Sequence, residues 1–274
     1  MALEPPRNAK VIAALAVLLL LIGFLIALWQ GQERILFQPP RLYDVSEEVG
    51  RVDYRAKDGQ ALVGYMLGNP RSAGRVLLCF HGNADLAVWQ ISWARMVSER
   101  SGSAVFLAEY RGYMSLGGKP SYNSTRLDAD AAYDQLRSQF NIDATRIAFY
   151  GHSLGSAVAA ELAERHRPFA LLLQSPFTSA RAMARLMVSP PVEIVWNRMS
   201  RIHFDTRNAV SQLDVPVWVA HGKRDLIVPF RMGMEVYEAA RNKGTLLVVE
   251  KAGHNDIVDV AGEDYWKWIR AALN

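Results

Sequence analysis

The sequence predicts an α/β protein in which a mostly parallel β-sheet is covered by helices on both faces and is preceded by one apolar N-terminal helix. Three observations predict this fold. Two alternating strands are followed by strands and helices in alternation, the order that builds a parallel sheet with two covered faces. The pattern Gly-His-Ser-Leu-Gly at residues 151–155 lies between an apolar strand and a helix. An uninterrupted apolar run of 19 residues extends from Val11 to Trp29.

The apolar run is long enough to cross the hydrocarbon core of a bilayer as a helix. Trp29 ends the run, where an interfacial aromatic side chain is typical. A cleaved signal peptide is the alternative, but its apolar core is usually shorter, and Leu25-Ile26-Ala27 is the nearest match to a small-x-small cleavage site. We therefore expect an uncleaved single-pass anchor at residues 11–29 after a flank at residues 1–10, with the lipid bilayer as a partner.

The charges beside the apolar run bear on its orientation in the membrane. Arg7 and Lys10 on the N-terminal side favour a cytoplasmic N-terminus, which places the rest of the chain on the extracytoplasmic side. Arg34 and Arg41 on the other side reduce that bias. The sequence therefore favours an extracytoplasmic catalytic domain and leaves the opposite orientation open.

A linker and one α/β domain follow the anchor. The linker spans residues 30–46, stiffened by Pro39-Pro40, and the domain spans residues 47–274. Apolar runs predict strands at Arg51–Lys57, Ala61–Leu67, Arg75–Phe80, Ala104–Glu109, Arg146–Tyr150, Phe169–Leu173, Val215–Ala220 and Leu246–Glu250. Helical spacing predicts helices at Ala84–Arg100, Tyr122–Phe140, Ser156–Ala163, Met232–Arg241 and Asp264–Leu273.

One segment departs from this alternation. Residues 175–211 separate two strands by far more than a crossover helix requires, and a long insertion above a sheet is usually functional. The segment leaves the sheet at the edge where catalytic loops gather, so we expect a small cap in which Trp196 and Met199 contact the substrate. An ordinary crossover helix with a long loop is the alternative.

The composition argues against several classes of function. Half of the 274 residues are hydrophobic and the net charge is +4 without a run of like charges, so no nucleic-acid partner is expected. Cys79 is the only cysteine, which rules out an intramolecular disulfide and a thiolate metal cluster. Gly117-Gly118-Lys119-Pro120 does not fit a phosphate-binding loop, because Tyr113 replaces the first glycine and Pro120 the Ser or Thr. We expect no metal and no cofactor.

The pattern at residues 151–155 supplies a candidate nucleophile, Ser153. A G-x-S-x-G between a strand and a helix is typical of a nucleophile elbow, a turn so tight that only small residues fit two positions before and after the serine. The bare pattern occurs by chance in roughly one chain of this length in ten. Its place between a strand and a helix, followed in order by an acid and a histidine, makes the assignment specific.

A serine hydroxyl needs an imidazole to take its proton and a carboxylate to orient that imidazole. In this architecture the order along the chain is Ser, acid, His, with the acid after a late strand and the histidine after the last one. Asp225 and His254 stand at these two places. His203 and His221 remain as alternative bases, and Asp205 as an alternative acid.

The oxyanion of a tetrahedral intermediate needs hydrogen-bond donors. One expected donor is the backbone N–H of Leu154, at the start of the helix that follows the serine. The other is the backbone N–H of Asn83, in a loop where Gly82 lets the backbone turn. A helix N-cap is the alternative role for Asn83.

Five short blocks occur in order along the chain: F-H-G-N-A from Phe80, Y-R-G-Y from Tyr110, G-K-P-S from Gly118, Y-G-H-S-L-G from Tyr150 and S-P-F-T-S from Ser175. From about residue 47 onward the chain resembles the α/β-hydrolase superfamily, and these blocks resemble its bud-emergence-type branch, which includes animal depalmitoylases. The resemblance implies an α/β-hydrolase fold with a Ser153, Asp225, His254 triad. It also implies Asn83 and Leu154 as oxyanion donors. Met114 stands where the family usually has glycine.

The motifs and the anchor together predict a membrane-anchored serine hydrolase that cleaves carboxylic esters or thioesters of acyl lipids or acylated proteins. A serine aminopeptidase is the second hypothesis. It needs acidic side chains to hold the substrate ammonium, and Glu193 and Asp205 are the acids that the expected cap offers. A non-catalytic scaffold with a hydrolase fold is the third.

Overall fold

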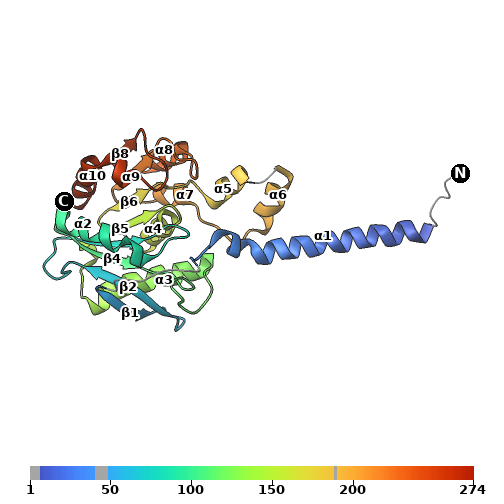
Figure 1. Ribbon diagram of the computed structural model, residues 1–274, viewed down its shortest axis with the longest axis horizontal. Coiled ribbons are helices and arrows are strands. Elements are labelled where there is room, and N and C mark those ends of the chain that lie inside the picture. The colour runs from blue at the N-terminus through green and yellow to red at the C-terminus, as the bar shows by residue number, and fades with distance from the viewer. Residues whose placement is uncertain (1–6, 41–48, 188–189) are drawn as a thin grey trace.

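The computed structural model describes residues 7–40, 49–187 and 190–274. Its centre is an eight-stranded sheet with the order β1-β2-β4-β3-β5-β6-β7-β8 (Figure 1). Strands β1 (Arg51–Arg55) and β2 (Ala61–Leu67) form an antiparallel hairpin, and β2 is also antiparallel to β4. All later pairs are parallel. The predicted mostly parallel sheet opened by a hairpin is therefore confirmed.

The six other strands form the parallel part of the sheet. They are β3 (Val76–Phe80), β4 (Ala104–Ala108), β5 (Ile147–His152), β6 (Leu171–Gln174), β7 (Val217–Gly222) and β8 (Lys243–Val249). Strands β3, β4 and β6 are buried at every residue. Because both of their faces are covered, these strands appear in the sequence as continuous apolar runs rather than alternating ones.

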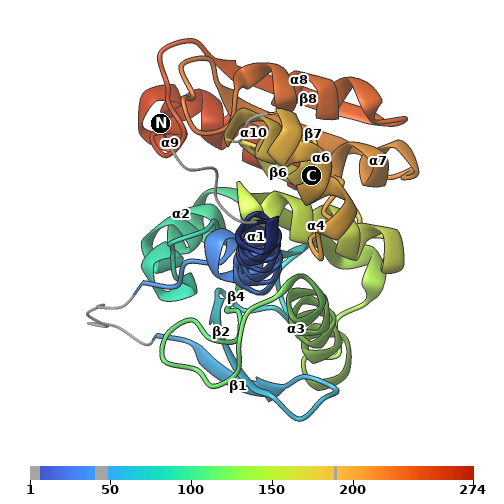
Figure 2. The same cartoon turned by 90° about the vertical axis from the view of Figure 1, so that its right-hand side faces the viewer.

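Helices cover both faces of the sheet (Figures 1 and 2). Helices α2 (Ile91–Ser101) and α10 (Glu263–Leu273) pack together on one face, with the short helix α9 (Ile257–Ala261) beside them. The other face carries a row in which each helix packs on the next: α3 (Tyr122–Asp134), α4 (Leu154–Arg165), α7 (Thr206–Ser211) and α8 (Phe230–Ala239). Short helical segments also occur in the described part of the chain: η1 (Ala87–Gln90), η2 (Gln135–Gln139) and η3 (Ala144–Arg146).

The N-terminal helix α1 (Arg7–Leu36) projects away from the domain (Figure 1). It contains the expected anchor at residues 11–29 and continues through residues 30–36, where the sequence predicted the start of a linker. The correction has a local cause, since the nearest prolines are Pro39 and Pro40, and a helix usually ends at or before the residue preceding a proline. Residues 41–46 of the expected linker lie outside the described residues.

The segment at residues 175–211 divides into two parts. Helix α7 packs against α4 and α8 and is an ordinary crossover helix. Helices α5 (Ala180–Met187) and α6 (Pro190–Met199) contact each other and stand outside the layers of the sheet, beside the base of α1 (Figure 1). Residues 188–189 lie outside the described residues, so the expected cap corresponds to α5 and α6 alone.

Candidate active site

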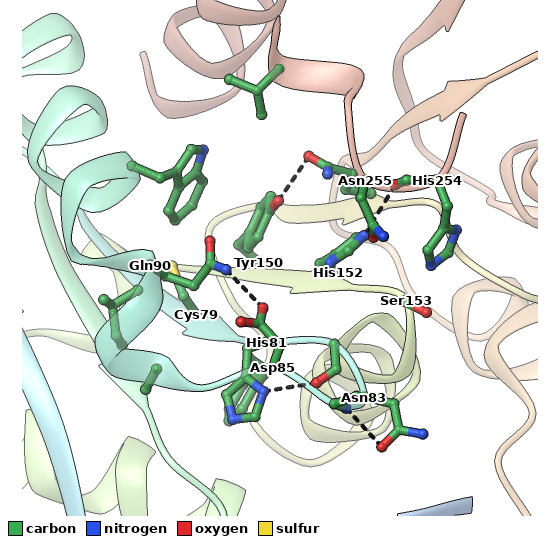
Figure 3. Close-up of a pocket in the computed structure, with 18 of the residues that line it drawn as sticks. Cys79, His81, Asn83, Asp85, Gln90, Tyr150, His152, Ser153, His254 and Asn255 are labelled. Atoms are coloured by element: carbon green, nitrogen blue, oxygen red, sulfur yellow. Dashed lines mark hydrogen bonds between the residues drawn. The ribbon is translucent and has the colours of Figure 1, made fainter. Parts of the chain in front are cut away.

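The site lies where the strand order of the sheet reverses. Strand β3 lies between β4 and β5, so the connections that follow β3 and β5 diverge and leave a crevice at the carboxyl ends of the strands. The register pairs Phe80 with Gly151, which brings the loop after β3 next to the turn after β5. A cavity of about 580 Å³ opens at this point, bordered by Ser153 and His254 among others (Figure 3).

The backbone at Ser153 forms a strained turn. Its φ of 51° and ψ of −114° lie in a region that L-residues rarely adopt, at a cost on the order of 1–3 kcal/mol. Glycine is required on both sides. A Cβ at Gly151 would overlap the Gly155 carbonyl, and a Cβ at Gly155 would overlap the carbonyl of Phe80. Helix α4 begins at the next residue, Leu154, so the turn holds the serine at a helix N-terminus.

His254 and Asp225 form a buried pair from the loops after β8 and β7. The Nδ1 of His254 donates to Oδ2 of Asp225 at 2.6 Å, and the Asp225 side chain is 0% exposed. With its proton on Nδ1, the imidazole keeps Nε2 as an acceptor. Oδ1 of Asp225 accepts the backbone N–H groups of Ile227 and Val228 at 2.9 and 2.8 Å. Burial opposes ionisation, but the hydrogen bonds from His221 and His254 hold the pKa of Asp225 well below its usual value.

The alternative bases and acid have other roles. His221 is fully buried, donates from Nε2 to the carbonyl of Val228 at 3.0 Å and lies 3.2 Å from Asp225, so it orders that loop. Asp205 accepts the backbone N–H of Asn208 and caps α7. His203 borders a second cavity beside α1 rather than the one at Ser153.

His152, the residue before the serine, lies against the predicted base. Its ring centroid is 5.1 Å from that of His254, and its Nε2 is 3.4 Å from the His254 carbonyl (Figure 3). Burial, together with the neighbouring His254, lowers the pKa of His152 to about 4. His152 is therefore neutral at neutral pH and adds no charge beside His254.

One expected oxyanion donor, Leu154, follows Ser153 directly, and the other, Asn83, belongs to a loop beside it. Leu154 is the first residue of α4, so its N–H has no acceptor within the helix. The loop that carries Asn83 fits closely against the serine, since a Cβ added to Gly82 would lie 3.5 Å from Cβ of Ser153. The alternative N-cap role of Asn83 is wrong, because the next helical segment starts at Ala87 with Leu86 as its N-cap.

A buried pair that was not predicted from the sequence lies beneath this loop. Nε2 of His81 donates to Oε1 of Glu109 at 2.7 Å, and Nδ1 of His81 donates to the Gly82 carbonyl at 2.8 Å. Because both ring nitrogens face acceptors, the ring fits as an imidazolium beside a carboxylate. Burial alone would lower the pKa of His81, but the charge and hydrogen bond of Glu109 outweigh burial and raise it.

The cavity walls differ from the expected ones. Apolar and aromatic side chains include Trp93, Tyr150, Ile227 and Val258, and polar ones include Asp85, Gln90, Gln174 and Asn255. The predicted substrate contacts, Trp196 and Met199, are absent from this lining. Trp196 packs against the core, and Met199 borders the second cavity with Trp29. The cause is the position of α6, which lies over the end of α1.

Among the described residues, no three His, Cys, Asp or Glu side chains gather in a way that would hold a metal ion.

Met114 stands where the resemblance expects glycine. Its φ of 47° is a left-handed conformation, which explains the family's preference for glycine at this position. Its sulfur accepts the Tyr65 hydroxyl at 3.4 Å.

Solved structures share this fold. The Pyrococcus furiosus esterase Pf2001 aligns with a TM-score of 0.67 at 22% identity, covering 86% of this chain and 99% of that one. An acetyl xylan esterase from Paenibacillus sp. R4 aligns with a TM-score of 0.65 at 22% identity, covering 89% and 93%. At this level of identity the similarity shows the fold alone.

Sequence comparisons narrow the relationship. The uncharacterized protein Rv2307c of Mycobacterium tuberculosis is 32% identical over 93% of this chain and 91% of its own length. Alpha/beta hydrolase domain-containing protein 17B of Xenopus laevis is 32% identical over 68% of this chain, and that match spans 62% of its length. A family model described as serine aminopeptidase, S33, matches residues 71–209, just over half of the chain. The chain is therefore a hydrolase of the α/β-hydrolase superfamily, and it belongs to the family described as serine aminopeptidase, S33.

Proposed function

We propose that this hydrolase is a membrane-anchored serine esterase or thioesterase that cleaves acylated substrates through a covalent acyl-enzyme. One observation supports the proposal most directly. Ser153, on its strained turn, and His254 border the same cavity, and the Nδ1 of that histidine is bonded to the buried Asp225. A hydroxyl, an imidazole and a carboxylate in this order are the groups that acyl transfer needs.

The geometry supports a two-step mechanism. Ser153 Oγ attacks the acyl carbonyl, and His254 Nε2 takes the hydroxyl proton and passes it to the departing alcohol or thiol. Asp225 orients the imidazole and stabilises the imidazolium that forms. The backbone N–H groups of Asn83 and Leu154 donate to the oxyanion. Water then attacks the acyl-enzyme with His254 as base, which releases the carboxylic acid and restores the serine.

The walls of the cavity favour an acyl group. Trp93, Tyr150, Ile227 and Val258 offer apolar surface beside Ser153. Each substrate methylene buried there would add about 0.8 kcal/mol of binding free energy. We therefore expect kcat/KM for p-nitrophenyl esters to rise with acyl length until the cavity is filled.

Aminoacyl hydrolysis is a second candidate, because one carboxylate lies in the same cavity. Asp85 borders it and accepts hydrogen bonds from the Gln90 side chain at 2.7 Å and the Leu86 N–H at 2.8 Å. Burial raises the pKa of Asp85, so pairing with a substrate ammonium would offset the cost of its charge. Neither acid expected in the cap, Glu193 or Asp205, borders this cavity, and Glu193 pairs with Arg185. Asp85→Asn should then lower turnover of aminoacyl p-nitroanilides far more than that of butyrate esters.

The membrane anchor is part of the proposal. Helix α1 has a stretch, Asn8–Leu36, that is long and apolar enough to cross a membrane, and the most apolar window of that stretch is 0% buried. Its 30 residues measure about 45 Å at the usual rise per residue. An apolar helix exposed on all sides is stable in lipid rather than in water. The flanking charges favour an extracytoplasmic site, which labelling of the domain in intact cells would test.

The decisive experiment labels the nucleophile. A fluorophosphonate probe should label the wild type and leave Ser153→Ala unlabelled. A panel of p-nitrophenyl esters, acyl-CoA and aminoacyl amides should then rank the substrate classes. Equal labelling of both proteins would contradict the assignment of Ser153, and an unlabelled wild type would favour a non-catalytic scaffold.

A further inference from the structure

The side chain of Asn83 joins the oxyanion loop to the end of α1. Its Nδ2 donates to the Leu36 carbonyl at 2.6 Å, and its Oδ1 accepts the backbone N–H of Gln38 at 2.9 Å. Oδ1 also accepts the Tyr113 hydroxyl at 3.1 Å and the N–H of Ala84 at 3.0 Å. These bonds use the amide on both its donor and acceptor sides, so the side chain of this cavity-lining residue holds two segments together.

The end of α1 contacts the domain at residues other than Asn83 as well. Leu36 is the last residue of the helix, where carbonyl groups lack intrahelical donors, and Asn83 supplies one. The next residue, Phe37, is buried at 3% exposure. Gln32, 1% exposed, accepts the backbone N–H of Arg201 at 2.7 Å. Figure 1 shows the base of α1 beside α6, and in Figure 2, a view along α1, the helix projects between α2 on one side and α3 and α4 on the other.

The loop that Asn83 belongs to depends on such outside contacts. Ala84 has a φ of 53°, a conformation that costs a non-glycine residue on the order of 1 kcal/mol or more. A Cβ added to Gly82 would lie 3.1 Å from Nδ1 of His152 and 3.5 Å from Cβ of Ser153, so the loop runs beside the serine. Because the Asn83 backbone and side chain belong to one residue, a displacement of α1 would also turn the Asn83 N–H, the oxyanion donor proposed above.

We propose that the segment from Leu36 to Gln38 at the end of α1 is a positioning element of the active site, and that Asn83 couples the position of α1 to its own backbone N–H. The proposal rests on the serine hydrolase function proposed above. Turnover then depends on how α1 is held, so the anchor tunes the chemistry in addition to placing the domain at a membrane.

The test uses the full-length protein in detergent micelles. Asn83→Ala removes the side-chain hydrogen bonds but keeps the backbone N–H of residue 83. A loss of kcat would therefore report a changed orientation of this N–H and not the absence of a donor. Phe37→Ala loosens the seat of α1 without changing the loop. Ile35→Ala, two residues earlier and 50% exposed, is the matched control.

We expect Asn83→Ala and Phe37→Ala each to lower kcat for p-nitrophenyl butyrate about 10- to 100-fold, below the loss for deleting a donor outright. KM should change less than about twofold, because the contact matters in the transition state. Rates are counted per active site titrated with a fluorophosphonate, which discounts unfolded protein. The double variant should lose no more than the larger single variant, since both act through one displacement. Ile35→Ala should match the wild type.

Unchanged kcat per titrated site in both variants would overturn the proposal, and so would losses that multiply in the double variant. If Asn83→Ala does not fold, Tyr113→Phe deletes one donor to the same oxygen and should lower kcat about three- to tenfold with KM unchanged. Activity that survives Ser153→Ala would instead refute the proposed serine hydrolase function. The failure of that function can therefore be distinguished from the failure of the positioning proposal.

Discussion

Replacing Glu109 by glutamine tests the charge state of the pair beneath the oxyanion loop. The Glu109 carboxylate is 0% exposed and accepts three hydrogen bonds: from His81 Nε2 at 2.7 Å, from the Tyr110 N–H at 2.9 Å and from the Ala87 N–H at 3.0 Å. An amide of the same shape removes the charge and sets an NH₂ group against one of these donors. His81 then loses its counter-ion, and either one of its ring hydrogen bonds or the bond from the Tyr110 N–H to residue 109 is lost.

The expected cost follows from burial. Removing one partner of a buried ion pair costs about 3–5 kcal/mol. At roughly 2–4 °C per kcal/mol for a domain of this size, Glu109→Gln should lower Tm by about 6–20 °C. Thermal unfolding of the full-length protein in detergent measures this shift, and Glu99→Gln, at an exposed position on α2, is the control.

The pH dependence of the stability difference between the wild type and Glu109→Gln distinguishes a charged His81–Glu109 pair from a neutral one. Glu109 raises the pKa of His81 in the folded state above its usual 6.5, so the pair contributes its full stability below about pH 6.5 and loses it as pH rises through the folded-state pKa. Without Glu109, burial lowers the pKa of His81. The difference in stability between the two proteins should therefore be larger at about pH 6 than at about pH 9. A Tm loss below about 2 °C, or a difference that does not narrow with rising pH, would refute the reasoning.

Three further outcomes follow from the geometry. Asp225→Asn should lower kcat about 10⁴-fold on short esters, because the imidazole loses its orienting acceptor; near-normal kcat would remove Asp225 from the triad. Trp93→Ala should flatten the rise of kcat/KM with acyl length, with a loss of about 0.8 kcal/mol for each methylene no longer buried. Trp196→Ala should leave that rise intact. The reverse pattern would show that Trp196 in the expected cap contacts the substrate. Full-length protein should stay in the membrane pellet after carbonate extraction, whereas a mature form that begins near Leu28 would show a cleaved signal peptide.

The fold and the tight turn at Ser153 could be predicted because their signals are local. Gly151 and Gly155 are fixed by steric overlap within one turn, so the pattern itself encodes the elbow. Strands covered on both faces must be continuously apolar, which made β3 and β4 visible as short runs. Asp225 and His254 are far apart in sequence, but the fold order of serine, acid and histidine restricts the choice to loops after late strands.

The role of the cap residues could not be predicted in the same way. The position of α6 depends on contacts such as the hydrogen bond between Gln32 and the Arg201 N–H, which join segments 169 residues apart. The apolar residues of α6 indicate that it covers something, but not whether it covers the cavity or α1. Expecting Trp196 to line the cavity therefore assumed a neighbour that the pattern does not encode.

The His81–Glu109 pair and the Leu36–Asn83 contact, both absent from the sequence analysis, differ in whether any pattern could have revealed them. Strands β3 and β4 pair in parallel with Phe80 opposite Ala108, so the residues that follow, His81 and Glu109, leave the sheet side by side. A histidine and a glutamate at matching ends of two consecutive apolar strands thus form a readable signal once parallel pairing is assumed.

The contact of Asn83 with the end of α1 uses the carbonyl of Leu36 and the N–H of Gln38. Every residue except proline carries both groups, so no choice of side chain on α1 marks this contact. The only side chain that marks this contact is that of Asn83. The F-H-G-N-A block that contains Asn83 was already explained by the expected oxyanion site. For this reason, the contact on which the proposed coupling of the site to α1 rests emerges only when the two segments are seen together.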